Sequence, residues 1–259
     1  MAEPAAIEFA RAGRRFDNGY AAIENIDLAI GAGRFVSVVG PSGCGKSTLL
    51  NLAAGLLDPT SGSVNIFGAP LAGLNARAGY LFQQDALLPW KTVRENVALG
   101  LAFRGREDAA QVREWIALVG LTGFEDHFPA QLSGGMRKRV ALAQTWIVQP
   151  DIVLMDEPFS ALDVHTRLRM ESEVLALWSA SRKTVLFVTH DLEEAIALAD
   201  EVVVLSAGPA SHIVARHEIA LPRPRSLIDI RTEPRFHEIY REIWSALRTE
   251  VLKSYERQL

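Results

Sequence analysis

The sequence contains a single cysteine, Cys44, among 259 residues. One thiol excludes an internal disulfide, which suits a reducing compartment. No apolar run approaches the ~18 residues that a membrane-crossing helix needs. The N-terminus also lacks the basic region followed by an apolar stretch that marks a secretory signal peptide. We therefore expect a soluble chain inside the cell.

An excess of positive charge is also missing. The formal net charge is −4 and the pI is about 5.9, which argues against nucleic acid as a partner because domains that bind it are usually basic. The length allows one large domain, and a hydrophobic content of 49% allows a sizeable core. Charge is biased only in the Arg-rich stretch 216–235, which we predict to be a solvated linker.

Residues 40–48 read GPSGCGKST and match the phosphate-binding pattern G-x-x-x-x-G-K-[ST]. An apolar, β-branched run at 35–39 precedes them and a helical run at 49–54 follows. This order of strand, loop and helix turns backbone N–H groups toward an anion and adds the positive end of a helix dipole. The predicted nucleotide-binding residues here are Gly40, Pro41, Ser42, Gly43, Cys44, Gly45, Lys46, Ser47 and Thr48.

Two side chains of this loop carry most of its predicted chemistry. Lys46 is placed to reach the β- and γ-phosphates of a nucleoside triphosphate, and the Ser47 hydroxyl to bind Mg²⁺. We interpret Cys44 as a small residue where a large one would clash, because nothing nearby suggests a base that could activate its thiol.

A second element of the phosphate site follows the apolar run 152–155. Asp156 and Glu157 end this predicted strand, at the edge where ligands bind in α/β sheets. Phosphoryl transfer depends on positioning and on charge neutralisation, so one carboxylate serves the metal and another the nucleophile. We therefore predict that Asp156 holds Mg²⁺, through water, and that Glu157 orients or deprotonates the attacking water.

The rest of the pattern predicts an α/β fold. Short apolar runs at 152–155, 184–188 and 201–205 alternate with helical stretches, which is typical of a parallel sheet. Residues 5–35 predict short antiparallel strands, 63–67 a further strand after a turn, and 91–147 a helical insert. From Thr232, which we expect to cap it, with Pro234 in its first turn, an amphipathic helix should pack onto the body rather than onto a membrane.

Further motifs give a specific resemblance. Leu132–Met136 (LSGGM) resembles the signature motif of ATP-binding cassette (ABC) ATPases, and Ser160–Asp163 (SALD) resembles their D-loop. The resemblance covers essentially the whole chain. It implies a P-loop NTPase fold with a RecA-like parallel sheet core, an N-terminal antiparallel β lobe and an inserted helical subdomain. The implied division of this single domain, 1–259, is a core at 1–90 and 148–220, a helical subdomain at 91–147 and a C-terminal helix at 232–258.

The resemblance also implies roles for individual residues. Gln83 would bind Mg²⁺ and sense the nucleotide, and His190 would contact the γ-phosphate as a catalytic residue. Phe16 would stack on adenine, with Tyr20 as the alternative. In this family two ATPase domains meet head to tail, so the signature of one chain closes the ATP site of the other. The signature residues that would contact this ATP are Ser133, Gly134 and Gly135.

Residues 79–96 resemble bacterial importer subunits, and Leu87-Leu88-Pro89-Trp90 is similar to the nitrate, sulfonate and taurine group. This implies uptake of a small solute by an ATPase subunit, bound as a homodimer at the cytoplasmic face of the bacterial inner membrane. Its partners would be transmembrane permease subunits and, indirectly, a solute-binding protein. A non-transport ABC ATPase of nucleic-acid metabolism is the alternative. The same segment could line a groove for the permease or close the core of the helical lobe.

The helix after the signature departs from the family pattern. The family usually has arginine at the position of Gln144, and Trp146 is bulkier than its usual counterpart. These departures affect the contact between that helix and the nucleotide-sensing loops, and they leave the phosphate site unchanged.

Overall fold

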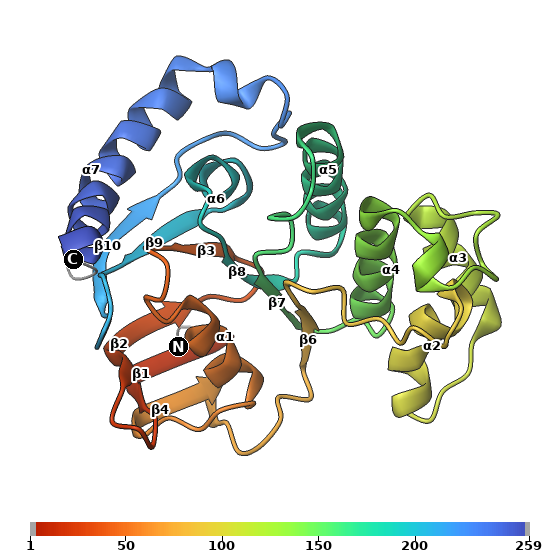
Figure 1. The fold of residues 1–259 in the computed structure, drawn as a ribbon, viewed down its shortest axis with the longest axis horizontal. Coiled ribbons are helices and arrows are strands. Elements are labelled where there is room, and N and C mark those ends of the chain that lie inside the picture. Colours follow the sequence, from red (N-terminus) through yellow and green to blue (C-terminus); the bar gives the residue numbers. More distant parts are fainter. Residues whose placement is uncertain (1–3, 257–259) are drawn as a thin grey trace.

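A computed structural model of the chain describes residues 4–256. Its larger sheet has six strands in the order β10-β9-β3-β8-β7-β6, all parallel except β10, which runs antiparallel to β9. Figure 1 shows this sheet at the centre of the molecule. Its strands are β3 (Phe35–Val39), β6 (Ala78–Leu81), β7 (Ile152–Asp156), β8 (Thr184–Val188), β9 (Glu201–Leu205) and β10 (Ile213–Glu218).

The central strands are continuous apolar runs because both faces of the sheet are covered. Every residue of β3, β8 and β9 is buried. One face packs against α1 (Lys46–Ala54) and a second, antiparallel sheet. That sheet has the order β2-β1-β4-β5, from β1 (Ile7–Arg15), β2 (Ala21–Ile30), β4 (Ser61–Ile66) and β5 (Ala69–Pro70).

The other face of the large sheet carries α5 (Val164–Ser181), α6 (Leu192–Leu198) and α7 (Pro234–Glu256). Helix α7 is placed by an apolar stripe in which Phe236, Ile239, Ile243 and Leu247 are buried. The prediction that the C-terminal helix packs onto the body is therefore confirmed for the described residues. Residues 257 and 258 of the predicted helix lie outside them.

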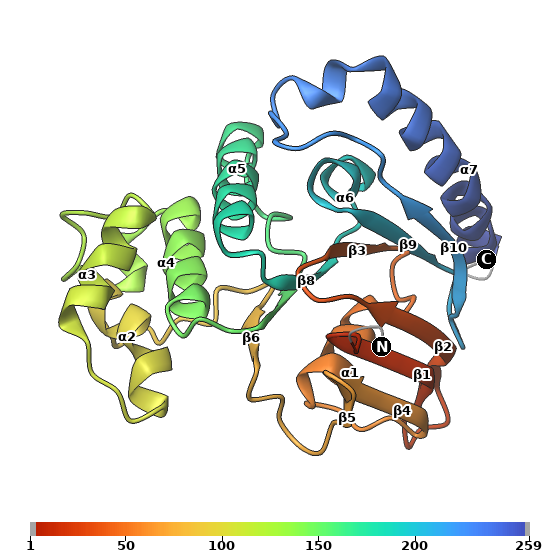
Figure 2. The ribbon, with the colours of Figure 1, turned by 180° about the vertical axis from the view of Figure 1, so that it is seen from behind.

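Three helices form a lobe at one end of the molecule, seen from behind in Figure 2. They are α2 (Val93–Phe103), α3 (Ala109–Leu118) and α4 (Gly134–Trp146), with the short 3₁₀ turn η1 (Pro129–Gln131) before α4. Thr92 and Glu95 close a reciprocal capping box at the start of α2, and Ser133 caps α4. The α/β class predicted from the sequence is confirmed, with both a largely parallel and an antiparallel sheet.

The C-terminal region differs from the prediction in two ways. Helix α7 begins at Pro234, whereas Thr232 ends the 3₁₀ turn η2 (Ile230–Thr232) and donates its hydroxyl to the Asp229 carbonyl. The helix therefore starts two residues later, and Thr232 does not cap it. Second, strand β10 is not predicted, because it alternates half-buried and exposed residues at a sheet edge and resembles a loop in composition. Outside this region, strands β5 and β6 are not predicted either.

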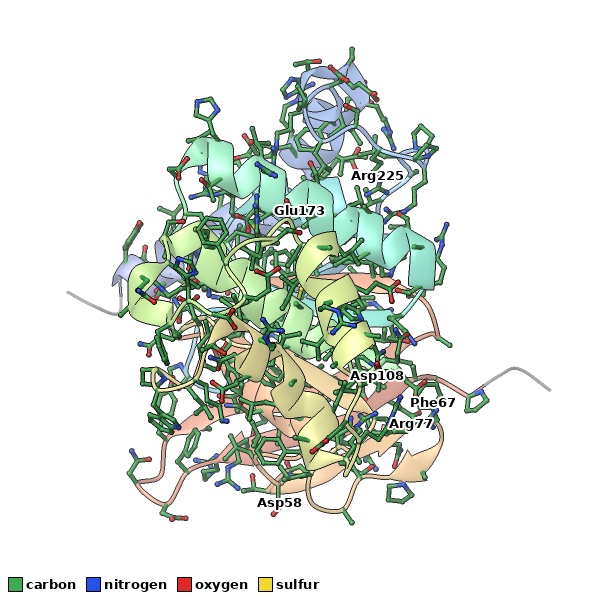
Figure 3. All side chains as sticks on the ribbon, turned by 90° about the vertical axis from the view of Figure 1, so that its right-hand side faces the viewer. Asp58, Phe67, Arg77, Asp108, Glu173 and Arg225 are labelled. Atoms are coloured by element: carbon green, nitrogen blue, oxygen red, sulfur yellow. The ribbon has the colours of Figure 1, made fainter. Side chains whose placement is uncertain are left out.

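The Arg-rich stretch is not a solvated linker. Arg225, labelled in Figure 3, is only 9% exposed, and its guanidinium donates to the carbonyls of Ala199, Ile196 and Ala197 at the end of α6. Burial lowers the pKa of this guanidinium to about 10. The last carbonyls of a helix lack partners within the helix, and a cation satisfies them while opposing the dipole. Arg225 thus fastens the C-terminal segment to the body.

No helix among residues 4–256 is long and apolar enough to span a bilayer.

Candidate functional site

The phosphate loop connects the buried strand β3 to α1, as the sequence predicts. Gly43 and Gly45 have φ values of 74° and 87°, in the left-handed region that favours glycine. At Gly40, a Cβ would lie 2.7 Å from the Cys44 sulfur, so side chains larger than hydrogen are excluded there. The loop is therefore shaped by close approach, and Cys44 is fully buried within it. Burial raises the pKa of the Cys44 thiol, which fits a packing residue.

Lys46 lies across the mouth of this loop. Its ammonium donates to the carbonyls of Gly40 and Pro41, at 2.9 and 3.1 Å, and the residue is only 7% exposed. These two hydrogen bonds hold the ammonium at the position that a phosphate would approach.

Asp156 and Ser47 meet at the end of strand β7. The Ser47 hydroxyl donates to Asp156 Oδ1 at 3.1 Å, although 109 positions separate them in sequence. Burial raises the pKa of the Asp156 carboxyl, the Ser47 hydrogen bond opposes this, and the neighbouring Glu157 adds to the rise. A cation here would offset the effects of burial and of Glu157 on this pKa. It would also find two oxygen ligands already side by side.

Glu157 and His190 form the opposite wall of the site. The Nδ1 atom of His190 lies 2.9 Å from Glu157 Oε2, and the Glu157 N–H donates to the Val188 carbonyl. Glu157 has a φ of 43°, in the left-handed region. This conformation costs a residue other than glycine about 1 kcal/mol or more, and it tends to occur at functional sites.

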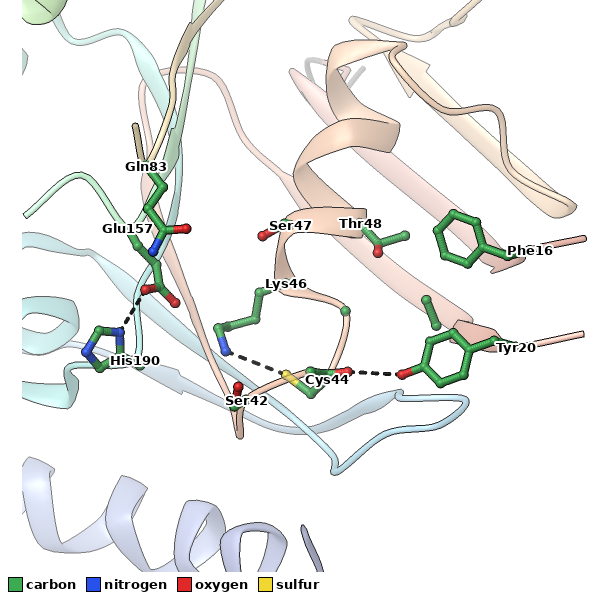
Figure 4. Close-up of a pocket in the computed structure, with 13 residues that line it drawn as sticks. Phe16, Tyr20, Ser42, Cys44, Lys46, Ser47, Thr48, Gln83, Glu157 and His190 are labelled. Carbon is green, nitrogen blue, oxygen red and sulfur yellow. Dashed lines mark hydrogen bonds and ion pairs between the residues drawn. The ribbon is translucent and has the colours of Figure 1, made fainter. Parts of the chain in front are cut away.

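These parts enclose one cavity of ≈ 680 Å³, drawn in Figure 4. It brings together the phosphate loop, both aromatic candidates, the glutamine of the loop after β6 and the Glu157–His190 pair. Most predicted site residues line it: Phe16, Ser42, Gly43, Cys44, Gly45, Lys46, Ser47, Thr48, Gln83, Glu157 and His190. Gly40, Pro41 and Asp156 do not line it, although they contact Lys46 or Ser47, which do.

The signature residues lie elsewhere. Ser133, Gly134 and Gly135 are at the start of α4 in the helical lobe, and none of them lines the cavity. Figures 1 and 2 both show α4 beyond β6 and β7 from α1. Ser133 and Gly134 are exposed, and Ser133 Oγ accepts from the Met136 N–H. A single chain therefore brings together only one side of the predicted ATP site.

The two aromatic candidates both line the cavity but differ in their contacts. The Tyr20 hydroxyl donates to the Gly43 carbonyl at 3.2 Å, so this ring is fixed to the phosphate loop. Phe16 lies at the turn before Tyr20, and the Arg14 guanidinium carbon lies 5.2 Å from its ring centroid. Nothing in the amino-acid pattern signals the Tyr20 contact, because its acceptor is a backbone carbonyl.

Lys138 is a further residue that sequence reasoning missed. It is 4% exposed on α4, and its ammonium donates to the Gln83 carbonyl at 2.6 Å and pairs with Asp85 at 3.1 Å. Arg137 also pairs with Asp85, at 3.0 Å. The signature helix is thus tied directly to the loop that carries Gln83.

Gln144 and Trp146 have different surroundings. Gln144 borders a smaller cavity of ≈ 210 Å³ together with Phe82 and Asp85, beside the loop that carries Gln83. Trp146 is 3% exposed, and its indole nitrogen has no hydrogen-bond partner within residues 4–256. The bulky Trp146 is therefore part of the core of the lobe.

Residues 87–90 do not all fit one role, either lining a groove for the permease or closing the core of the helical lobe. Leu87 packs against the main core, which fits closure of the helical lobe, whereas Trp90 is 69% exposed, which fits a surface groove.

Comparison with known families decides the class. Residues 23–160 match the family described as ABC transporter. The chain belongs to this family. The match spans the phosphate loop, the signature motif and the two carboxylates of β7. ATP and Mg²⁺ are accordingly its nucleotide and metal.

Curated relatives narrow the subgroup. The taurine import ATP-binding protein TauB of Burkholderia pseudomallei (strain 1710b) is 47% identical over 85% of this chain and 86% of its own length. The aliphatic sulfonates import ATP-binding protein SsuB of Bacillus cereus (strain ATCC 10987 / NRS 248) is 41% identical over 91% and 88%. Both are import subunits, which favours the importer interpretation over the alternative in nucleic-acid metabolism.

Solved structures agree with the fold. A dimeric bacterial ABC transporter cassette superposes with a TM-score of 0.74 at 32% identity, over 83% of this ABC ATPase and 100% of that chain. A dimeric post-hydrolysis state of a cassette, bound to ADP and Pi, gives the same TM-score at 31% identity. The P-loop ATPase fold predicted from the sequence is confirmed.

Proposed function

We propose that this ABC ATPase energises the import of a small sulfonate-type or similar solute, with taurine and alkanesulfonates as the first candidates. One observation supports the ATP-driven part most strongly: the cavity gathers Lys46, Ser47, Glu157 and His190, while Ser133 lies outside it. The taurine and sulfonate import subunits at 41–47% identity support the solute class.

In the proposed site the nucleotide lies along the cavity from the aromatic residues to the Glu157–His190 pair. Phe16 stacks on adenine, because Tyr20 is already engaged with the phosphate loop. Residues 40–48 surround the phosphates with backbone N–H groups, and the Lys46 ammonium neutralises charge on the β- and γ-phosphates.

Our division of the chain into a core (1–90 and 148–220) and a helical subdomain (91–147) is part of the same proposal.

The donor set fits Mg²⁺. Ser47 and Asp156 supply adjacent oxygen atoms, and Gln83 lines the same cavity. Within residues 4–256 no group of three or more His, Cys, Asp or Glu side chains could hold a metal by itself. Mg²⁺ commonly keeps waters and phosphate oxygens as ligands beside one or two protein groups, so this small set is sufficient. When bound, the metal neutralises phosphate charge as the γ-phosphoryl group is transferred.

Glu157 is proposed to orient the attacking water and to accept its proton, and His190 to contact the γ-phosphate. The 2.9 Å contact between them fixes the direction of the carboxylate. The γ-phosphoryl group moves from the leaving oxygen of ADP to the water oxygen, and the water proton passes to Glu157, which leaves ADP and inorganic phosphate.

The second half of the site is proposed to come from another copy of this chain. Ser133, Gly134 and Gly135 are at an exposed helix N-terminus, whose N–H groups and dipole favour an anion. In a head-to-tail homodimer they reach the γ-phosphate held by the partner. ATP binds the closed dimer better than the open one, and this difference shifts the population toward closure.

The chain is proposed to act at the cytoplasmic face of the bacterial inner membrane, bound to permease subunits that receive solute from a solute-binding protein. The exposed Trp90 and neighbouring Leu88 and Pro89 are candidates for the permease contact.

The test is copurification and uptake. A tagged chain expressed with its natural chromosomal neighbours should copurify from detergent extracts with membrane subunits, and its deletion should abolish uptake of radiolabelled taurine or alkanesulfonate. The Lys46→Ala variant is the matched control, since it should copurify normally but not restore uptake. Hydrolysis stimulated by DNA or RNA, with no membrane partner, would instead support the nucleic-acid alternative.

A further inference from the structure

The phosphate loop rests on a segment distant in sequence, the turn 205–208 that leaves β9. A Cβ placed on Gly208 would lie 3.0 Å from the Gly43 carbonyl oxygen, and one placed on Gly40 would lie 3.2 Å from Leu205. These distances mean that the turn is in close contact with the phosphate loop at Gly40 and at Gly43. In Figure 4 the pale blue chain after β9 runs below Ser42 and Cys44. The turn is thus the floor of the phosphate loop.

The floor is held from its far side by helix α7. Glu250 Oε2 accepts the backbone N–H of Ala207 at 2.9 Å, across 43 positions of sequence. Glu250 is 5% exposed, and Lys253 donates to its other oxygen at 2.6 Å. Burial alone would raise the pKa of Glu250, but the bonds from Lys253 and Ala207 lower it, so the carboxylate is charged.

The residues that directly follow this floor are attached to the antiparallel sheet. Ala210 and Ser211 donate their N–H groups to the carbonyls of Ala21 and Ala22, at 2.6 and 3.2 Å. Ala22 lines the nucleotide cavity, and the Tyr20 hydroxyl reaches over to the Gly43 carbonyl. The chain after β9 is therefore held on one side by Glu250 of α7 and on the other by the antiparallel sheet, which forms part of the cavity wall.

We propose that Glu250 is a positioning residue for the phosphate loop: through Ala207 and Gly208 it sets the height of the Gly43 backbone, and so the affinity for ATP. It does not touch the nucleotide. The inference rests on the proposed nucleotide site, and it adds that the C-terminal helix takes part in nucleotide binding rather than only covering the sheet.

A purely structural role explains Glu250 less well. Helix α7 already buries Phe236, Ile239, Ile243 and Leu247 against the body, which is enough to dock it. A buried carboxylate adds a desolvation cost. Among residues 4–256 it accepts hydrogen bonds from the Ala207 N–H, which it holds in place, and from Lys253. The placement is explained if the floor of the loop must be held in one position.

The experiment compares the full-length chain with three variants by ATP–Mg²⁺ titration, steady-state hydrolysis and thermal melting. Glu250→Ala removes the acceptor, and Gly208→Ala forces the floor against Gly43 while leaving α7 unchanged. Leu247→Ala is the matched control, because Leu247 is buried under α7 one turn before Glu250, and its loss leaves the Glu250 carboxylate in place. The control should melt at a lower temperature and bind ATP as the unaltered chain does.

We expect both Glu250→Ala and Gly208→Ala to raise the Kd and KM for ATP about tenfold, with kcat within about twofold, which is the loss of one charge-assisted contact. Glu250→Gln, which keeps an acceptor oxygen, should recover most of the affinity. The proposal is overturned if Glu250→Ala lowers only the melting temperature, or if Leu247→Ala weakens ATP binding equally. Should Glu250→Ala not fold, Gly208→Ala still tests the floor itself, and an ATP affinity equal to that of the unaltered chain would overturn the proposal. Failure of the unaltered chain to bind ATP would instead refute the proposed nucleotide site.

Discussion

The His190 imidazole and the Glu157 carboxylate lie 2.9 Å apart, although 33 positions separate them in sequence. The contact joins the loops that follow two neighbouring strands, β7 and β8, at the carboxyl edge of the sheet. It directs the carboxylate toward the cavity in which the phosphate loop ends. The proposed hydrolysis step therefore depends on tertiary structure, because its two residues come from different motifs that the sheet brings together.

Glu157→Gln should bind ATP with nearly unchanged affinity and hydrolyse it at least about 100-fold more slowly, because the amide cannot accept the proton of the attacking water. The measurement is release of inorganic phosphate at saturating ATP, alongside an ATP titration. Rapid turnover by this variant would remove Glu157 from the role proposed for it.

Lys46→Ala should lose ATP affinity, since the side chain supplies the positive charge that faces the β- and γ-phosphates. A nucleotide titration checks this, with Lys183→Ala as control because Lys183 does not line the cavity. Unchanged binding by Lys46→Ala would sink the assignment.

Ser133→Arg should abolish hydrolysis while a single chain still binds ATP. Ser133 lies outside the cavity of its own chain, so a bulky cation there can only obstruct the approach of a partner. Binding and hydrolysis are measured on the same preparation. An equal loss of both would argue against a site shared between two chains.

The pH dependence of stability should report the buried Glu194. Glu194 is 3% exposed, and this burial raises the pKa of its carboxyl to about 8. The Thr189 hydroxyl donates a hydrogen bond to the carboxyl at 2.7 Å. Asp191 and Glu171 add to the rise, and Arg167 opposes it. Because the folded state keeps a proton that the unfolded state releases above about pH 4.5, this group stabilises the fold at low pH.

The free energy of unfolding should therefore fall as pH rises toward 8, by at most about 1.4 kcal/mol per pH unit from this group. Urea unfolding at pH 5.5, 6.5, 7.5 and 8.5 measures the slope, and Glu194→Gln is the control that should flatten it. Identical slopes in the two proteins would show that Glu194 is ionised in the fold.

Much of the site can be read from the sequence because its chemistry is local. The phosphate loop needs glycines at fixed spacing, and the carboxylates of β7 follow a recognisable buried strand. The central parallel strands β3, β7, β8 and β9 were equally readable, since strands covered on both faces are continuous apolar runs.

What could not be predicted depends on backbone acceptors and donors. Arg225 binds the terminal carbonyls of α6, Lys138 the carbonyl of Gln83, and Glu250 the N–H of Ala207. Main-chain groups leave no mark in the sequence, so these charged residues resemble solvated ones. The same reason explains why the Arg-rich stretch was wrongly predicted to be a linker.

The central claim is that one chain supplies half of an ATP site. The most direct test is the molar mass of Glu157→Gln, measured by light scattering with and without saturating ATP–Mg²⁺. We predict a change from the 28.4 kDa monomer to about twice that mass, and no change when Ser133→Arg is added to the same chain. A monomer at saturating ATP, or a dimer that forms equally well with Ser133→Arg, would contradict the account.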